Sequence, residues 1–402
     1  MNKAFTAILA ATFFATLTIE AAAEKNYAPG VSDTEIKIGQ TMPYSGPASA
    51  LGTAGRAHAA YLKMINDKGG INGRKIRLIS LDDAYNPAKT VEQTRRLVEQ
   101  DGVALIFGSL GTAPNMAIHK YVNAKKLPHL FIASSSSRWN DPTNFPWTMM
   151  TIRPSFEMEG RGYAKYILRT RPNGKIGVLY QNDEQGKDYL RGLREGLGSR
   201  ADEFLVSEQS YELTDTTVDS QIVTLKASGA DVLLNFSTPK FGAQAIRKSY
   251  DIAWKPLHVV AFTASAIKPV LQPAGLEKSI GLISSSVTKD PSDPQWRNNP
   301  AIADYLAWMK SYYPDGDPDD WSNVAGYTTA QMLVHVLKSC EDDLSRENIM
   351  RQAASMTNLE LPMLLPGIRV NTSPTDYLPV EQFQFVQFDG KRWVRIGEVV
   401  GK

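Results

Sequence analysis

The polar residues best placed to do chemistry lie in short loops that follow apolar, strand-like runs. Three such loops, at residues 43–47, 109–112 and 133–136, carry serine or threonine hydroxyls and free backbone N–H groups, but no catalytic set. Hydroxyls donate hydrogen bonds, and backbone N–H groups at helix starts favour a bound anion. The same side chains also cap helices in many proteins. As a set, however, the loops predict a site that holds an anion and does no chemistry.

Three further loops, at residues 181–183, 236–238 and 262–265, follow apolar runs in the second half of the chain. Two of them contain phenylalanines, Phe236 and Phe262, that offer flat apolar walls to a ligand. The alternative for both rings is core packing at a strand end. The two interpretations stay open on this evidence.

The motifs of several enzyme classes are missing from the sequence. No Gly-x-Gly-x-x-Gly run follows a strand, and neither a P-loop nor a Gly-x-Ser-x-Gly elbow occurs. The five histidines are scattered without metal-ligand spacing. Asp82 and Asp83 are adjacent on a strand, so their side chains point to opposite faces and do not form an acid/base pair. We therefore expect no catalytic residue, no metal site and no cofactor.

Alternating elements must position these loops. Strand-like runs at residues 36–41, 75–82 and 101–108 alternate with helices predicted over residues 48–68 and 86–100. This β-α-β rhythm predicts a parallel, doubly wound sheet, in which the carboxyl ends of the strands border the ligand crevice.

The second half of the chain repeats the rhythm and closes with a hairpin at Asp389-Gly390. The sequence thus predicts an α/β protein with two doubly wound, Rossmann-like lobes and a cleft between them. The second-half strands are expected at residues 175–180, 203–210, 232–236, 258–262, 281–287, 382–388 and 392–399.

Composition and the chain start limit the setting of the protein. The 402 residues include 44 basic and 42 acidic ones, for a net charge of +2, and no basic stripe points to nucleic acid. One cysteine allows no internal disulfide. A lysine, an apolar stretch and small residues within residues 1–23 predict a cleaved secretory signal peptide, and hence a periplasmic protein.

The motifs at residues 36–47, 66–75, 82–87, 101–108 and 181–188 together resemble the periplasmic binding proteins of branched-chain-amino-acid-type ABC importers. The resemblance implies a type I, two-lobed "Venus flytrap" that closes over its ligand by a hinge and delivers it to an ABC permease in the inner membrane. We expect a monomer. The lobes are expected to comprise residues 24–150 plus 285–362, and residues 151–284 plus 363–402.

The resemblance also implies where the ligand is held. The family's contacts fall on the loops after the strands in both lobes, including the turn at residues 262–264. With neighbouring loop residues, the expected ligand-binding set is Tyr44, Ser109, Leu110, Gly111, Ala133, Ser134, Ser135, Gln185, Phe236, Phe262 and Thr263.

Two departures from the family pattern bear on the ligand. Residues 260–265 contain no acid to pair with the ammonium of an amino acid, and Gln185 stands where an aromatic residue is common. An unpaired buried ammonium is costly, so we expect a small carboxylate without an amine, with an aromatic or branched body. The alternatives are a branched-chain amino acid bound by the same fold, a ligand-sensing periplasmic receptor, or a periplasmic α/β enzyme.

Overall fold

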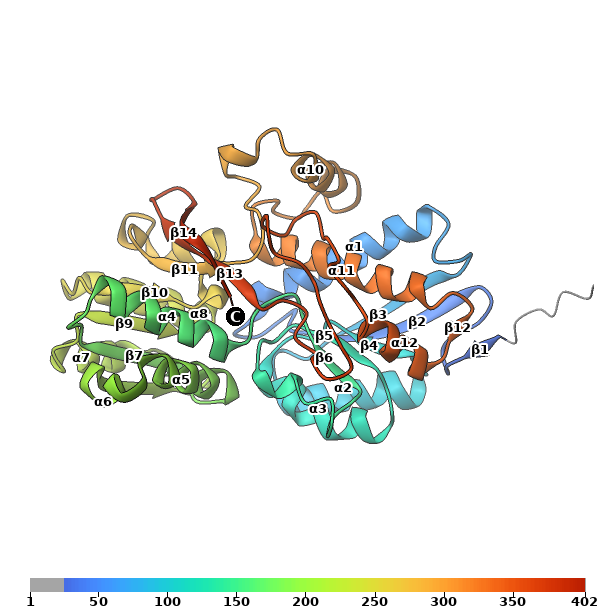
Figure 1. Ribbon diagram of the computed structural model, residues 1–402, viewed down its shortest axis with the longest axis horizontal. Coiled ribbons are helices and arrows are strands. Elements are labelled where there is room, and N and C mark those ends of the chain that lie inside the picture. Colours follow the sequence, from blue (N-terminus) through green and yellow to red (C-terminus); the bar gives the residue numbers. More distant parts are fainter. Residues whose placement is uncertain (1–24, 402) are drawn as a thin grey trace, which may run out of the picture.

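The computed structural model describes residues 25–401, in which two lobes lie side by side along the long axis (Figure 1). The predicted signal peptide lies outside the described residues. Each lobe is built on one sheet, with five strands in the first and seven in the second, and a two-stranded pair stands apart from both. The predicted two-lobed α/β architecture is confirmed. The separate pair joins β1 (Asn26–Tyr27) to β12 (Asp343–Leu344).

The first sheet is parallel throughout, in the order β3-β2-β4-β5-β6. Its strands are β2 (Glu35–Met42), β3 (Lys75–Asp82), β4 (Leu105–Phe107), β5 (His129–Ile132) and β6 (Thr148–Met150). Its helices are α1 (Thr53–Asp67), α2 (Pro87–Arg95), α3 (Thr112–Ala124), α10 (Pro300–Tyr312), α11 (Trp321–Ser339) and α12 (Arg346–Ala353). Side-chain alternation along β4 fills both faces, because Ile106 packs in one cluster with α3 while Phe107 packs in another with α1.

The second sheet has the order β14-β13-β11-β10-β9-β7-β8, parallel from β11 to β8 and antiparallel at β13 and β14. Its strands are β7 (Ile176–Gln181), β8 (Leu205–Tyr211), β9 (Val232–Phe236), β10 (Leu257–Val260), β11 (Ile283–Ser286), β13 (Gln382–Phe388) and β14 (Trp393–Gly401). Its helices are α4 (Phe156–Thr170), α5 (Glu184–Leu197), α6 (Ala201–Phe204), α7 (Asp219–Ala227), α8 (Pro239–Asp251) and α9 (Gln272–Ala274). Helices cover both faces, since Val178 packs with α4 and α5 and Leu179 packs with α7 and α8.

The expected lobe boundaries can be compared with the observed strands and contacts. The boundary predicted at residue 285 falls inside β11, which belongs whole to the second sheet. The Tyr377 N–H donates to Asn140 Oδ1 at 2.6 Å, and the Tyr377 hydroxyl donates to the Pro146 carbonyl at 3.2 Å. That segment therefore lies against the first lobe. We propose that the chain leaves the second lobe after Ser286 and returns to it near residue 382 rather than 363.

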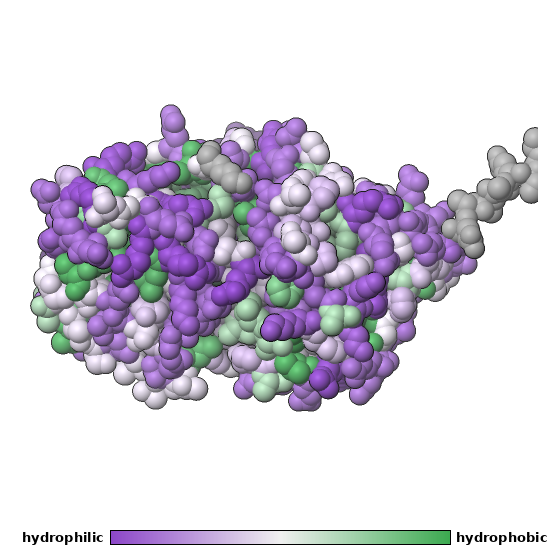
Figure 2. Space-filling model, turned by 60° about the horizontal axis from the view of Figure 1, so that its bottom comes forward, coloured by the Kyte–Doolittle hydropathy of each residue, from purple (hydrophilic) through white to green (hydrophobic). Residues whose placement is uncertain are grey.

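Most large apolar side chains are buried inside the lobes. On the face shown in Figure 2, hydrophilic residues prevail and hydrophobic ones form small separate patches. None of the helices in the described part of the chain combines the length and the apolar character that a membrane span requires.

Candidate ligand-binding site

A cavity of about 70 Å³ lies between the lobes, where the strands of both sheets end. We call it the cleft cavity. Its walls come from the loops after β3, β4, β5, β9 and β10, from α1, α5 and α11, and from the crossing between β6 and α4. Eight predicted residues line it: Leu110, Gly111, Ala133, Ser134, Ser135, Gln185, Phe262 and Thr263.

Tyr44, Ser109 and Phe236, also predicted for the site, do not line this cavity. The Tyr44 hydroxyl is 2.6 Å from Ser80 Oγ, and Ser109 Oγ accepts the Thr41 N–H at 3.1 Å. The Phe236 ring is fully buried and stacks on Tyr189, with centroids 4.2 Å apart. Each of these side chains thus contacts groups within its own lobe, and Phe236 packs in the core, which was the alternative interpretation for this ring.

Backbone pairing fixes the first-lobe wall. Leu110 and Ala133 form a parallel bridge, and the Gly111 N–H donates to the Ala133 carbonyl at 3.2 Å. Gly111 has a φ of +107°, and a Cβ there would meet the Tyr85 ring at 2.6 Å, so the turn requires glycine. Of the neighbouring serines, Ser134 bonds to other side chains, whereas Ser135 Oγ is buried without a hydrogen-bond partner.

The sequence interpretation missed Tyr85, which lines the cavity from the loop after β3. Its φ of +58° is unusual for a bulky residue, and Asp83 holds it by accepting the Tyr85 N–H at 3.0 Å. Asp82 similarly accepts the Ala84 N–H at 3.0 Å. The two adjacent carboxylates therefore shape a loop, in line with the rejected acid/base pair. The signal available in the sequence was a tyrosine three residues after the predicted end of a strand.

Arg153 was also missed, and it is the cation on the cavity wall. It lies in the crossing between β6 and α4, only 6% exposed, with its Cζ 3.4 Å from the Phe262 ring centroid and 5.5 Å from that of Trp321. Its Nη2 is 3.8 Å from Oε1 of the buried Glu159. Burial lowers the pKa of Arg153 and raises that of Glu159.

The unpartnered side-chain atoms on the cavity wall are hydrogen-bond donors or hydroxyls. They are Ser135 Oγ, Arg153 Nε and Nη2, Gln185 Nε2, Trp321 Nε1 and Ser322 Oγ. Within the described chain, no Asp or Glu lines the cavity. Burial lowers the pKa of His58, the one lining histidine, to about 3, so its ring is neutral at pH 7. The cavity is therefore built to receive hydrogen-bond acceptors and negative charge.

Comparison with known proteins agrees with this architecture. The family model described as "Periplasmic binding protein" matches residues 35–392. The chain belongs to this family of periplasmic binding proteins. It is similar to Leu/Ile/Val-binding protein homolog 7 of Brucella melitensis, with 24% identity over 314 residues that cover 76% of this chain and 77% of that one.

Two solved binding proteins share the fold of this one. A branched-chain amino acid ABC transporter protein from Thermus thermophilus, with bound valine, superposes with a TM-score of 0.82 at 15% identity, covering 92% of this chain and 98% of that one. An ABC transporter solute-binding protein from R. palustris, in complex with benzoate, has a TM-score of 0.77 at 17% identity, with the same coverages of 92% and 98%. These likenesses confirm the fold, and the family is one of substrate-binding proteins.

This binding protein has a second cavity of about 60 Å³ on the other side of Arg153, Phe262 and Trp321, which line both. We call it the crossing cavity, because it borders the segment after β11. Its walls carry both signs of charge, including Lys289 and Asp290. Lys289 Nζ donates to backbone carbonyls, and Asp290 accepts from Ser292. Both of these charged side chains are thus engaged by groups outside the cavity lining.

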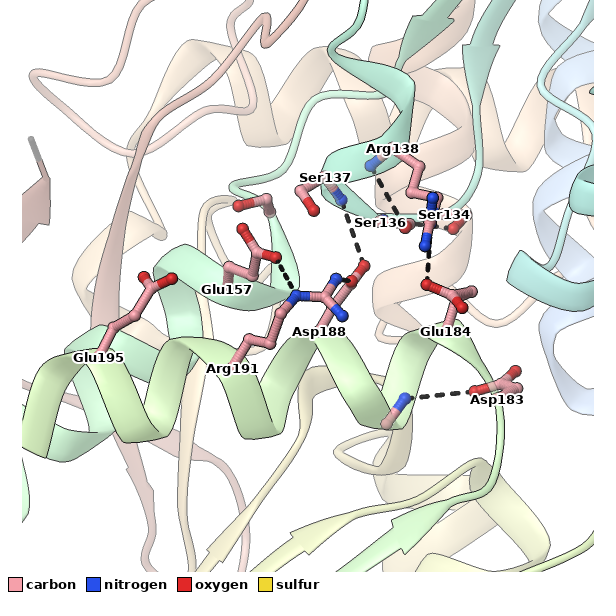
Figure 3. Close-up of polar contacts among 12 residues, drawn as sticks. Ser134, Ser136, Ser137, Arg138, Glu157, Asp183, Glu184, Asp188, Arg191 and Glu195 are labelled. Carbon is pink, nitrogen blue, oxygen red and sulfur yellow. Dashed lines mark hydrogen bonds and ion pairs between the residues drawn. The ribbon is translucent and has the colours of Figure 1, made fainter. Parts of the chain in front are cut away.

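A polar rim joins the two lobes beside the cleft cavity (Figure 3). Arg138, in the loop after β5, donates to Glu184 of α5 at 2.9 Å, and the Ser137 N–H donates to Asp188 Oδ2 at 3.2 Å. Arg191 of α5 contacts Asp188 as well. We call these five residues the rim. The lobes are therefore in direct contact in this structure.

Residues 25–401 bring together no group of three or more His, Cys, Asp or Glu side chains able to hold a metal ion. The single cysteine, Cys340, is buried, and its thiol donates to the Val336 carbonyl at 3.3 Å. Burial raises the pKa of this thiol to about 12, so it stays protonated and unreactive.

Proposed function

We propose that this protein is the extracytoplasmic solute-binding component of an ABC importer, and that it binds a small organic carboxylate without an amine in the cleft cavity. One observation carries the proposal: the unpartnered side-chain atoms on the cavity wall are donors or hydroxyls, and the described lining includes no acid. A carboxylate satisfies such groups, because its two oxygens accept several hydrogen bonds.

An amino acid fits this lining less well, because its ammonium needs an acceptor or a counter-charge. Two carboxylates nearby are already engaged: Glu184 pairs with Arg138, and Asp183 accepts from Gln181 Nε2 at 2.6 Å and the Gly186 N–H at 3.2 Å. Burying an ammonium without a partner costs several kcal/mol. The solved relatives hold valine in one case and benzoate in the other, and the donor lining favours the second chemistry.

The size of the cavity limits the ligand body. Its volume of about 70 Å³ is smaller than the roughly 150 Å³ of an apolar cavity known to admit benzene. Apolar groups such as Leu110, Phe156 and Phe262 surround it. A branched acid and an aromatic acid therefore both require the lobes to sit slightly further apart than in this structure.

Calorimetric titration with matched pairs tests the ligand class. Leucine is compared with 4-methyl-2-oxopentanoate, and phenylalanine with phenylpyruvate and benzoate. We expect the acids without an amine to bind more tightly. Tighter binding of the amino acids would contradict the proposal and favour the branched-chain amino acid alternative.

The transport role is tested separately. Small-angle scattering should show a smaller radius of gyration when the bound acid saturates the protein, because hinge closure compacts two lobes. Uptake of that acid should fall in cells that lack the gene. An unchanged radius of gyration would contradict closure. Unchanged uptake would contradict the importer role and the partnership with an inner-membrane permease.

A further inference from the structure

Arg153 has an incomplete set of hydrogen bonds for a buried arginine. Its side chain is only 8% exposed, yet Nε and Nη2 are buried without any hydrogen-bond partner. An uncompensated guanidinium in a protein interior is strongly destabilising. Buried polar groups without a hydrogen-bond partner are rare in folded proteins, so each one calls for an explanation.

The surroundings of Arg153 hold the guanidinium without satisfying it. The Phe262 ring lies 3.4 Å from Cζ, which fixes the plane but accepts no conventional hydrogen bond. Glu159 is the nearest acid, but its Oε1 is 3.8 Å from Nη2, beyond hydrogen-bond length.

Glu159 is directed to other donors. Its Oε2 accepts the Tyr189 hydroxyl at 2.6 Å, and its Oε1 accepts the Ser285 hydroxyl at 2.5 Å. Both carboxylate oxygens are therefore engaged by hydroxyls from α5 and β11. The acid balances part of the charge of Arg153 through the 3.8 Å ion pair, and Nε and Nη2 keep no hydrogen-bond partner within the protein.

We propose that Arg153 is the main counter-charge of the ligand, and that it binds the ligand carboxylate side-on through Nε and Nη2. These two nitrogens share one edge of the guanidinium, and that edge matches the two oxygens of a carboxylate. The inference rests on the proposed function and deepens it. It places the charged end of the ligand at the crossing between the lobes, whereas the sequence predicts an anion site in the first-lobe loops.

This placement makes Arg153 a specificity-determining residue. A planar carboxylate uses both N–H groups, a neutral amide uses its single oxygen, and an ammonium is repelled. Because Arg153 stands in the segment that connects the lobes and Glu159 contacts Ser285 beside the next crossing, the charge of the ligand acts where the lobes are joined.

The test compares carboxylates with their neutral amides in calorimetric titration. The probes are benzoate and 4-methyl-2-oxopentanoate, with benzamide and 4-methyl-2-oxopentanamide as the matching uncharged ligands. The main variant is Arg153→Gln with Glu159→Gln, which avoids leaving a buried carboxylate unpaired. Arg161→Gln, which removes an exposed arginine paired with Glu195, is the control for the loss of an arginine away from the cavity.

We expect the double variant to bind the carboxylates ten- to a hundredfold more weakly and the amides within about threefold of the unmodified protein. Arg161→Gln should change neither affinity. Arg153→Lys keeps the charge but loses the two-pronged edge, and its carboxylate affinity should also fall at least about tenfold.

Each outcome decides a different point. If the unmodified protein binds no carboxylate, the proposed function fails and this inference fails with it. If carboxylates bind and the double variant retains their affinity within about threefold, the proposed function stands and the role of Arg153 is wrong. Should the double variant not fold, as judged by circular dichroism, Arg153→Lys decides alone, and an unchanged carboxylate affinity overturns the inference.

Discussion

The wall of the cleft cavity and the rim beside it use charge in opposite ways. On the wall, Arg153 and Gln185 are buried with donor atoms that have no partner. On the rim, Arg138 is 53% exposed and paired with Glu184. Exposed ion pairs contribute at most about 1 kcal/mol, whereas unpartnered buried polar groups cost more than that. The donors on the wall can thus gain hydrogen bonds when a ligand binds, whereas the ion pairs on the rim determine how the two lobes contact each other.

This difference predicts that the wall controls ligand affinity and that the rim controls how the lobes close. Removing an unpartnered polar group from the wall should weaken ligand binding strongly and should change protein stability little, or even raise it. Groups on the rim should change affinity weakly and in a salt-dependent way. If variants of these polar wall groups lost ligand affinity and protein stability together, the distinction between the wall and the rim would be wrong.

The largest effect is expected for Phe262, the ring that supports Arg153. Phe262→Ala should lower the free energy of unfolding by about 3–5 kcal/mol and weaken carboxylate binding about thirtyfold or more, because an aromatic contact surface is lost. The control is Phe236→Ala, which empties the core beside Tyr189 away from the cavity. It should cost similar stability in urea unfolding while affinity stays within about threefold. If both variants lost affinity equally, the loss would come from a general disturbance of the core and not from the ring that contacts Arg153.

The next effect concerns Asp183, which caps α5 beside the rim. Burial raises the pKa of this carboxyl from 3.8 to about 6. Between those pH values the folded protein keeps a proton that the unfolded chain has lost, so its contribution to stability falls as pH rises, by about 3 kcal/mol in total. Urea unfolding from pH 4 to 7 should show that Asp183→Asn loses this part of the pH dependence. If the free energy of unfolding changed with pH in the same way in the variant and the unmodified protein, this role of Asp183 would be wrong.

Much of the fold was predictable from the sequence, because local patterns determine it. The bounds of β3, β9 and β13 match the apolar runs. Asn86, where the second helix is predicted to begin, caps α2 by accepting the Ala88 N–H at 2.9 Å. The path of residues 366–380 was not predictable. It depends on contacts such as Tyr377 with Asn140, which are distant in sequence and leave no periodic pattern.

The site was predictable only in part, for a related reason. Parallel strands end at one edge, so the loops that contain Leu110, Ala133 and Phe262 could be brought together on topology alone. Ser109 points back to Thr41, since a side chain at a strand end has two possible directions. Arginines are rarely buried, so nothing local marked Arg153. Its burial follows from rings and helices of both lobes meeting around it.

A smaller effect is expected for Ser135, whose buried hydroxyl has no partner. Ser135→Ala should weaken carboxylate binding about tenfold, the value of one hydrogen bond to a charged group, without lowering the melting temperature. The matched control is the adjacent Ser136→Ala. Ser136 is also buried, but its Oγ accepts the Arg138 N–H at 3.4 Å, so this variant should lose some stability and keep its affinity. A reversed pattern would assign the ligand hydrogen bond to the wrong serine.

The smallest effect is expected on the rim, from the pair of Arg138 and Glu184. A double-mutant cycle with Arg138→Gln and Glu184→Gln should give a coupling of about 0.2–1 kcal/mol in ligand binding, since both side chains reach solvent. Affinity should fall at most about fivefold. The coupling should vanish near 0.5 M salt, where the screening length is only about 4 Å, while the buried contact of Arg153 should persist. Lys63 and Asp67 form an exposed pair on α1 and supply the control cycle, with no coupling to binding expected. A salt-resistant coupling of several kcal/mol at the rim would show that closure, rather than the cavity wall, supplies most of the binding energy.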